Sequence, residues 1–305
     1  NSIPRNLKLG IAAGIGLFLG YIALKNAGVV VDDAATLTSL GALTEFEPLM
    51  MLAGFGLIVA LTARGIRGAV VIGILAAAAV GWITGEVAFG GVFSAPPEWL
   101  PVLGQLDIAG AMTLSMATVI LSFLIVDVFD TAGTLVGVAT RANMLDAEGK
   151  LPRLRRALFA DSGATVVGAL AGTSSTTSYI ESAAGVEAGG RTGLTAVTVG
   201  LLFLACVFLA PLAASVPAYA TASALLYVAC LMARSLADLD RGDITESAPA
   251  VLAAVAMPLT FSIADGIGLG FLSYAIIKVA SGRPAQCPAA VYVIAAIFGA
   301  RYVFL

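Results

Sequence analysis

The chain has 305 residues, of which 59% are hydrophobic and only 11% are charged, whereas a soluble domain carries roughly 25% charged residues. Its mean hydropathy of +1.00 is typical of a polytopic α-helical membrane protein. The net charge of -3 excludes a basic nucleic-acid-binding surface, and the absence of histidine excludes Ser-His triads and histidine-based zinc sites. Any proton chemistry must therefore use carboxylates. The three cysteines are odd in number and far apart, which argues against a disulfide framework or a metal site.

Apolar stretches of about 15 to 20 residues mark the predicted membrane spans. In chain order they lie near residues 9–24, 48–63, 68–84, 108–139, 158–172, 174–190, 193–212, 217–233, 247–263, 265–280 and 287–304. Alternating their direction places 14 of the 16 basic residues on one face, which the positive-inside rule makes cytoplasmic. The last stretch either crosses the membrane or lies at its interface. These ten or eleven segments predict an all-α, multi-pass protein of the cell membrane, with the lipid bilayer as its partner.

Small residues at four-residue spacing predict where helix backbones approach closely in lipid. The pairs are Gly10 with Gly14, Gly16 with Gly20, and Gly133 with Gly137. Such faces would also allow a homodimer. The first residue is Asn1 and no signal-peptide pattern follows it, so we expect the natural chain to begin upstream.

Two acidic side chains lie deep inside the apolar stretch 108–139. An ionisable residue within a membrane helix costs about 2.5–3.5 kcal/mol to insert and is a functional candidate by default. Helical periodicity places Asp127, Asp130, Thr131 and Thr134 on one stripe, so two acids and two hydroxyls should point together. The alternative is that each aspartate only holds the helix bundle together.

Residues 172–191 interrupt the apolar pattern with six consecutive hydroxyl residues, Thr173 to Ser178. This run is too polar and too β-branched for a lipid-facing helix, and it predicts an extended backbone that lines a wet cavity. A helix that restarts near Glu181 would create a discontinuous helix, the device by which transporters build binding sites at the membrane midplane. A polar turn outside the membrane is the alternative.

Other polar or aromatic positions are weaker candidates. Tyr179 and Phe129 could stack on a planar ligand, although packing is the commoner role of an aromatic residue in a membrane helix. Asp161, next to Ser162, fits a helix cap as well as a functional group. Asp265 precedes a glycine-rich stretch and fits a cap or a turn.

The two polar regions resemble the adenine/guanine/hypoxanthine permease branch of the nucleobase:cation symporters, which is related to the uracil and xanthine permeases. The similarity lies in VDVFDTAGTLVG at 126–137, GTSSTTSYIESAAGVEAGGRTGLT at 172–195, VPAYAT at 216–221 and MPLTFSIADGIG at 257–268. It extends along the whole chain.

The resemblance implies a fold of two inverted seven-helix repeats, with a substrate-carrying core domain and a gate domain. The chain would begin at the fifth helix. Residues 1–84 would be gate helices of the first repeat, and residues 85–107 an extracellular loop. Residues 108–215 would be core helices of the second repeat, broken at 172–190 by a short extended segment, and residues 216–305 would be its gate helices.

The resemblance also implies the activity, which is uptake of purine nucleobases by a secondary active transporter, coupled to H⁺, without a cofactor and by an elevator-type movement of core against gate. The acids that match Asp127 and Glu181 contact the base or couple the proton, and the acid that matches Asp130 is needed for transport. The implied substrate site is Asp127, Glu181, Tyr179, Thr177, Ser178 and Phe129, with Asp130, Thr131 and Thr134 as coupling or structural residues. Thr131 stands where the uracil branch has a histidine, so a histidine-assisted proton step is excluded.

Two alternatives remain beside this hypothesis. A transporter of the same fold could move another small anion or solute. An intramembrane aspartyl protease would also need two buried aspartates, but that class resembles a Tyr-Asp pair and a Gly-x-Gly-Asp motif, whereas this chain has no Tyr-Asp pair and reads Asp265-Gly-Ile-Gly. The sequence therefore favours a transporter over an enzyme.

Overall fold

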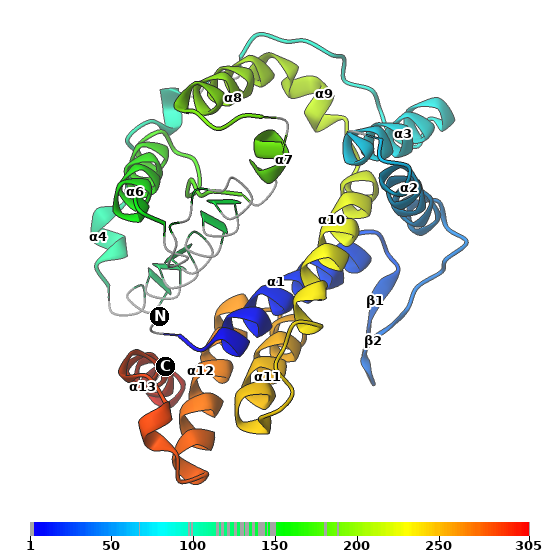
Figure 1. Cartoon of the computed structure of the whole chain (residues 1–305). Coiled ribbons are helices and arrows are strands. Elements are labelled where there is room, and N and C mark those ends of the chain that lie inside the picture. Colours follow the sequence, from blue (N-terminus) through cyan, green and yellow to red (C-terminus); the bar gives the residue numbers. More distant parts are fainter. Residues whose placement is uncertain are drawn as a thin grey trace. The chain divides into compact units, whose positions relative to one another are not determined.

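The computed structural model describes residues 3–66, 68–96, 98, 100–113, 151–179, 182–187 and 189–304, with isolated positions between 116 and 146. The chain divides into two compact units (Figure 1). Unit 1 combines Asn1–Gly91 with Leu212–Leu305, and unit 2 is Val92–Pro211.

Unit 1 is built from long apolar helices. They are α1 (Arg5–Asn26), α2 (Phe46–Ala63), α3 (Ala69–Thr84), α10 (Ala218–Ala233), α11 (Ile244–Thr260), α12 (Ile263–Ala280) and α13 (Ala289–Phe304), with the 3₁₀ turns η3 (Arg234–Leu236) and η4 (Pro284–Gln286). Helix α1 packs along both α10 and α11 (Figure 1). Helix α12 contacts α11 and α13.

Glycines on α1 allow this close packing. A methyl group on Gly10 would overlap the carbonyl oxygen of Ala250 on α11, and one on Gly14 would lie 2.8 Å from the Cα atom of Ala254. Helix α1 therefore meets α11 backbone to backbone, because neither glycine has a side chain to hold the helices apart. The prediction for this pair of glycines is confirmed.

The second pair of glycines on α1 faces α10. A methyl group on Gly16 would lie 2.6 Å from the Cβ atom of Met232, and one on Gly20 would lie 3.1 Å from the Cβ atom of Ala229. The prediction holds here as well. The third predicted pair, Gly133 and Gly137, lies outside the described residues.

A short antiparallel hairpin, which the apolar pattern of the sequence does not predict, joins α1 to α2. Strand β1 (Val30–Asp33) pairs with β2 (Leu37–Leu40). Asp33 closes the turn, because its Oδ1 atom accepts hydrogen bonds from the amides of Ala35 at 2.9 Å and Thr36 at 2.8 Å. These hydrogen bonds favour the carboxylate and hold the pKa of Asp33 below its ordinary value.

Unit 2 contains shorter elements and one helical stretch that is described only in part. They are η1 (Leu100–Val102), α4 (Ile108–Ala111), α6 (Leu154–Leu170), α7 (Ser182–Glu187), α8 (Gly193–Cys206) and η2 (Val207–Leu209), followed by α9 (Ala210–Ala214) at its boundary. The described positions from Met116 to Ala139 are helical as well. The turn η1 lies within the predicted loop 85–107.

Within the described part of the chain, five helices are long and apolar enough to cross a membrane. They are Arg5–Asn26, Phe46–Ala63, Gly193–Ala214, Ala218–Leu236 and Ile263–Ala280. Three shorter apolar helices, Ala69–Thr84, Ile244–Thr260 and Ala289–Val303, correspond to further predicted spans. The mostly helical, polytopic architecture agrees with the prediction.

Candidate functional site

Helix α6 ends abruptly at the start of the hydroxyl-rich run. Gly172 follows the helix with φ of +79°, and its amide donates to the carbonyl of Ala169 at 3.1 Å. The amide of Thr173 donates to the carbonyl of Gly168 at 2.9 Å. These two bonds form a Schellman motif, which satisfies the last carbonyls of the helix and turns the chain away from its axis. Residues 173–179 then have neither helical nor strand structure.

The hydroxyl-rich run is tied to the helical stretch that carries Asp127. Thr131 Oγ1 lies 2.7 Å from Thr177 Oγ1, and Thr134 Oγ1 lies 2.7 Å from Ser178 Oγ. Thr131 is only 1% exposed, so its hydroxyl depends on protein partners. Two consecutive residues of the run thus bond two residues that lie about one helical turn apart.

Helix α6 holds the other side of the run. Thr165 Oγ1 donates to the carbonyl of Thr176 at 2.8 Å and accepts from the amide of Thr176 at 3.2 Å. Gly168 allows the approach, because a methyl group there would lie 3.2 Å from the carbonyl oxygen of Ser174. This non-helical segment is therefore held between α6 and the helical stretch, mostly by threonine hydroxyls.

Asp161 also belongs to this network, a position that the sequence pattern did not predict. It lies within α6 rather than at its start, so the helix-cap interpretation is wrong. Thr131 Oγ1 lies 3.3 Å from Asp161 Oδ2, and the Asp161 carboxylate interacts electrostatically with Asp127. Neither aspartate has a salt-bridge partner among the described residues. The signal that could have found Asp161 was its position inside a predicted span, where an acid is a functional candidate.

Three of the remaining predicted site residues lie outside the described part of the chain, namely Glu181, Asp130 and Phe129. Tyr179 is described and its side chain is 65% exposed. Helix α7 begins at Ser182, directly after the predicted restart position.

The described site consists of hydroxyl and carboxylate groups beside a non-helical segment. Hydroxyls and a backbone that is neither helical nor in a strand offer both donors and acceptors, and carboxylates accept N–H groups. In the part of the chain that the structure describes, no cluster of three or more Cys, Asp or Glu side chains could hold a metal ion. A polar break among apolar helices is the arrangement of a membrane transporter.

Comparison with known proteins gives the family. Residues 1–269 match a permease family, that of the xanthine/uracil permeases. The chain is 48% identical over 304 residues to the adenine permease AdeP of Escherichia coli (strain K12), covering 100% of this chain and 68% of that protein. Identity to adenine permease AdeQ of the same strain is 46% over 305 residues, covering 100% and 69%. Guanine/hypoxanthine permease PbuO of Bacillus subtilis (strain 168) is 43% identical over 303 residues, covering 97% and 70%.

The chain therefore belongs to the xanthine/uracil permease family and is a multi-pass protein of the cell membrane. The predicted resemblance is confirmed. Membership in a permease family also sets aside the aspartyl protease alternative, because the chain is a transporter and not an enzyme.

Proposed function

We propose that this protein takes up purine nucleobases across the cell membrane. Relatives that the whole chain matches at 46–48% identity are named adenine permeases, and one at 43% is named a guanine/hypoxanthine permease. The site chemistry suits this substrate class, because a neutral purine carries N–H donors and ring acceptors on one planar edge.

The observation that carries the site assignment is the pair of 2.7 Å bonds from Thr131 to Thr177 and from Thr134 to Ser178. They bring the run at 173–179 against the helical stretch of Asp127, although about 45 residues separate the two in sequence. Together with Glu181 and Tyr179, these groups would surround the base, with Phe129 and Asp130 in supporting roles. Backbone amides of the run would donate to ring nitrogen or oxygen atoms, and a carboxylate would accept an N–H group.

Coupling to H⁺ would use the carboxylates, since the chain has no histidine. Asp127 and Asp161 interact without a described cation between them. The Thr131 hydroxyl links Asp161 to the run that would hold the base, and Asp127 lies on the helical stretch that carries Thr131. Substrate and proton would thus act on one hydrogen-bonded network.

The architecture proposed for this transport is a gate domain and a substrate-carrying core from inverted seven-helix repeats. Its support is the division of the chain, since unit 2 (Val92–Pro211) contains the whole described site and unit 1 contains none of it. An elevator-type movement would carry unit 2, with the base, against a static unit 1. A homodimer through unit 1 would supply that static support.

The experiment is uptake of labelled adenine, guanine and hypoxanthine by purine-transport-deficient cells that express the complete gene, with and without a protonophore. We expect purine accumulation that the protonophore abolishes, and loss of accumulation in Asp127→Asn and Glu181→Gln variants of equal membrane abundance. Accumulation that survives both substitutions would refute the site assignment. A well-inserted protein that moves no purine would favour the alternative of another small solute.

A further inference from the structure

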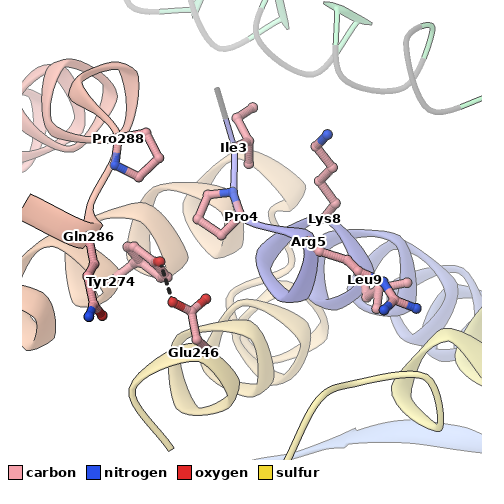
Figure 2. Close-up of a pocket in the computed structure, with 9 residues that line it drawn as sticks. All are labelled: Ile3, Pro4, Arg5, Lys8, Leu9, Glu246, Tyr274, Gln286 and Pro288. Carbon is pink, nitrogen blue, oxygen red and sulfur yellow. Dashed lines mark hydrogen bonds between the residues drawn. The ribbon is translucent and has the colours of Figure 1, made fainter. Parts of the chain in front are cut away.

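A second polar site lies in unit 1, apart from the site described above. A pocket of about 630 Å³ opens among the N-terminal end of α1, the first turn of α11, the C-terminal half of α12 and the connection before α13 (Figure 2). Its polar lining residues are Arg5, Lys8, Glu246, Tyr274 and Gln286. None of these residues belongs to the purine site proposed above.

The wall formed by α1 is basic and firmly placed. Arg5 and Lys8 are three residues apart, share one stripe of the helix and are both exposed. Between them, Asn6 is 4% exposed and Leu7 is fully buried. The Asn6 side chain donates to the carbonyl of Asp240 at 2.9 Å and accepts from its amide at 3.1 Å. This end of α1 is thus anchored, while its two cations have no ion-pair partner among the described residues.

Among the described lining residues the single acid, Glu246, already forms an ion pair. Glu246 Oε1 lies 2.7 Å from Lys278 Nζ, and Lys278 is fully buried behind the pocket wall. The Tyr274 hydroxyl donates to the same oxygen at 2.7 Å (Figure 2). The acid nearest to this network outside the pocket, Asp243, is paired with Arg283 at 2.9 Å. Arg5 and Lys8 are therefore the lining charges without an ion-pair partner among the described residues. Because both are positive, the pocket favours an anion.

The positive end of α1 adds to this preference. No side chain caps the helix at Pro4, and the positive end of the helix dipole attracts negative charge. Of the other lining residues, Gln286 is polar and exposed, whereas Ile3, Pro4, Leu9 and Pro288 are apolar and only partly buried. A ligand that fits therefore has an anionic group beside an apolar body.

We propose that this pocket binds the phosphate group of an anionic phospholipid of the cytoplasmic leaflet. The basic-residue bias assigns Arg5, Lys8, Lys278 and Arg283 to the cytoplasmic side, and the structure gathers the helix ends that carry them around one pocket. Basic pockets between membrane helices on this side are suited to acidic headgroups. The site would fix a lipid to unit 1 and does not depend on the substrate that is transported.

The test compares lipid binding by delipidated protein from the complete gene, measured by native mass spectrometry. The probes are dioleoyl phosphatidylglycerol and dioleoyl phosphatidylcholine, which share acyl chains. The pocket variant is Arg5→Gln with Lys8→Gln. The matched control is Arg153→Gln with Arg156→Gln, because these arginines have the same spacing, are exposed and lie at the N-terminal end of α6. Both variants change only exposed side chains, and both should elute as the wild type does in size exclusion.

We expect the wild type to bind phosphatidylglycerol more tightly than phosphatidylcholine. The pocket variant should lose about 25-fold in phosphatidylglycerol affinity, since each basic residue near an anionic lipid surface contributes about fivefold. The control variant should keep the wild-type affinity. Unchanged binding in the pocket variant, or an equal loss in both variants, would overturn the proposal.

A second arm separates the lipid from free phosphate. Thermal unfolding of the wild type and the pocket variant is measured with phosphatidylglycerol or with inorganic phosphate. Stabilisation of the wild type alone by phosphatidylglycerol supports the lipid site. Stabilisation of the wild type alone by inorganic phosphate, with no effect of the lipid, would assign the pocket to a soluble phosphate and overturn the lipid proposal.

Discussion

Thr131 is the residue through which the described site is connected. Its single hydroxyl lies 2.7 Å from Thr177 and 3.3 Å from Asp161, and the side chain is almost fully buried. Removing the hydroxyl takes a hydrogen bond from two half-buried partners, one of them a carboxylate, which costs about 0.5–3 kcal/mol. Thr131 therefore positions both Asp161 and the hydroxyl-rich run.

We expect Thr131→Val to reduce initial rates of purine uptake at least tenfold, because valine keeps the shape and loses the hydroxyl, and about 1.4 kcal/mol corresponds to a factor of ten. Thr131→Ser keeps the hydroxyl and should retain most of the activity. The control is Thr198→Val, since among the described residues the Thr198 hydroxyl donates to the carbonyl of Leu194 within its own helix. Equal rates for the valine and serine variants at position 131 would contradict the connecting role.

Lys278 shows how a buried charge constrains its neighbours. It is fully buried, whereas the Glu246 side chain is 28% exposed. Loss of the acid therefore leaves an unpaired cation inside the protein, which costs about 3–5 kcal/mol, while loss of the lysine leaves an acid that water can reach.

This pair predicts an order of unfolding temperatures among three variants. Glu246→Gln should lower the unfolding temperature more than Lys278→Met does, and the double variant should be more stable than Glu246→Gln alone. Thermal unfolding of the purified protein in one detergent measures all three variants. Additive losses in the double variant would mean that the two residues do not form an energetic pair.

At the scale of elements, the contact between α1 and α11 depends on the missing side chain at Gly10. Helix propensity alone predicts that alanine stabilises a helix relative to glycine by about 0.5–1 kcal/mol. At Gly10 the added methyl group would overlap the Ala250 backbone, which cannot move aside as a flexible side chain can. Overpacking of this kind costs about 1–3 kcal/mol.

We therefore expect Gly10→Ala to lower the unfolding temperature and Gly56→Ala to leave it unchanged or raise it. Gly56 lies in α2 with no atom within 4 Å of an added methyl group. The two substitutions are chemically identical, so opposite signs would isolate the interhelical contact. A neutral Gly10→Ala variant would show that α1 and α11 can separate at little cost.

The helices and the helix break could be predicted from the sequence because hydrophobic length and a run of hydroxyl residues are local signals. The glycine faces of α1 were predictable for the same reason, since spacing of four residues is visible in one helix. The hairpin at 30–40 was missed, because each strand has only four residues and a search for long apolar stretches passes over it.

Contacts between distant residues could not be predicted in this way. The sequence shows that Asp127, Thr131 and Thr134 share a stripe, but it does not show which residues face them. Asp161 and Thr165 enter the site from α6 only through tertiary packing. The pairing of Lys278 with Glu246 is likewise a consequence of how α11 and α12 pack.

At the scale of the whole molecule, the charge bias predicts which ends of the helices face the cytoplasm. The β1–β2 hairpin follows the end of α1 that carries Lys25, so it should be extracellular, whereas the connection from α12 to α13 should be cytoplasmic. The exposed positions Thr36 and Ala285 represent these two sides.

Single cysteines at these two positions test the orientation in a background that lacks Cys206, Cys230 and Cys287. We expect an impermeant maleimide to label Thr36→Cys in intact cells and Ala285→Cys only after the membrane is opened. The reverse pattern would show that the orientation is opposite to the predicted one. Labelling of both cysteines in intact cells would contradict an odd number of membrane crossings between the two positions.

The hairpin also gives a way to image this protein. The described residues lie mostly in apolar helices, and such helices offer electron microscopy few features outside the detergent belt by which particles can be aligned. The turn between β1 and β2 is exposed from Ala34 to Leu37, and its strands pair with each other alone within the described residues. An antibody epitope placed at that turn would leave the helix packing of unit 1 intact and would supply an alignment mark.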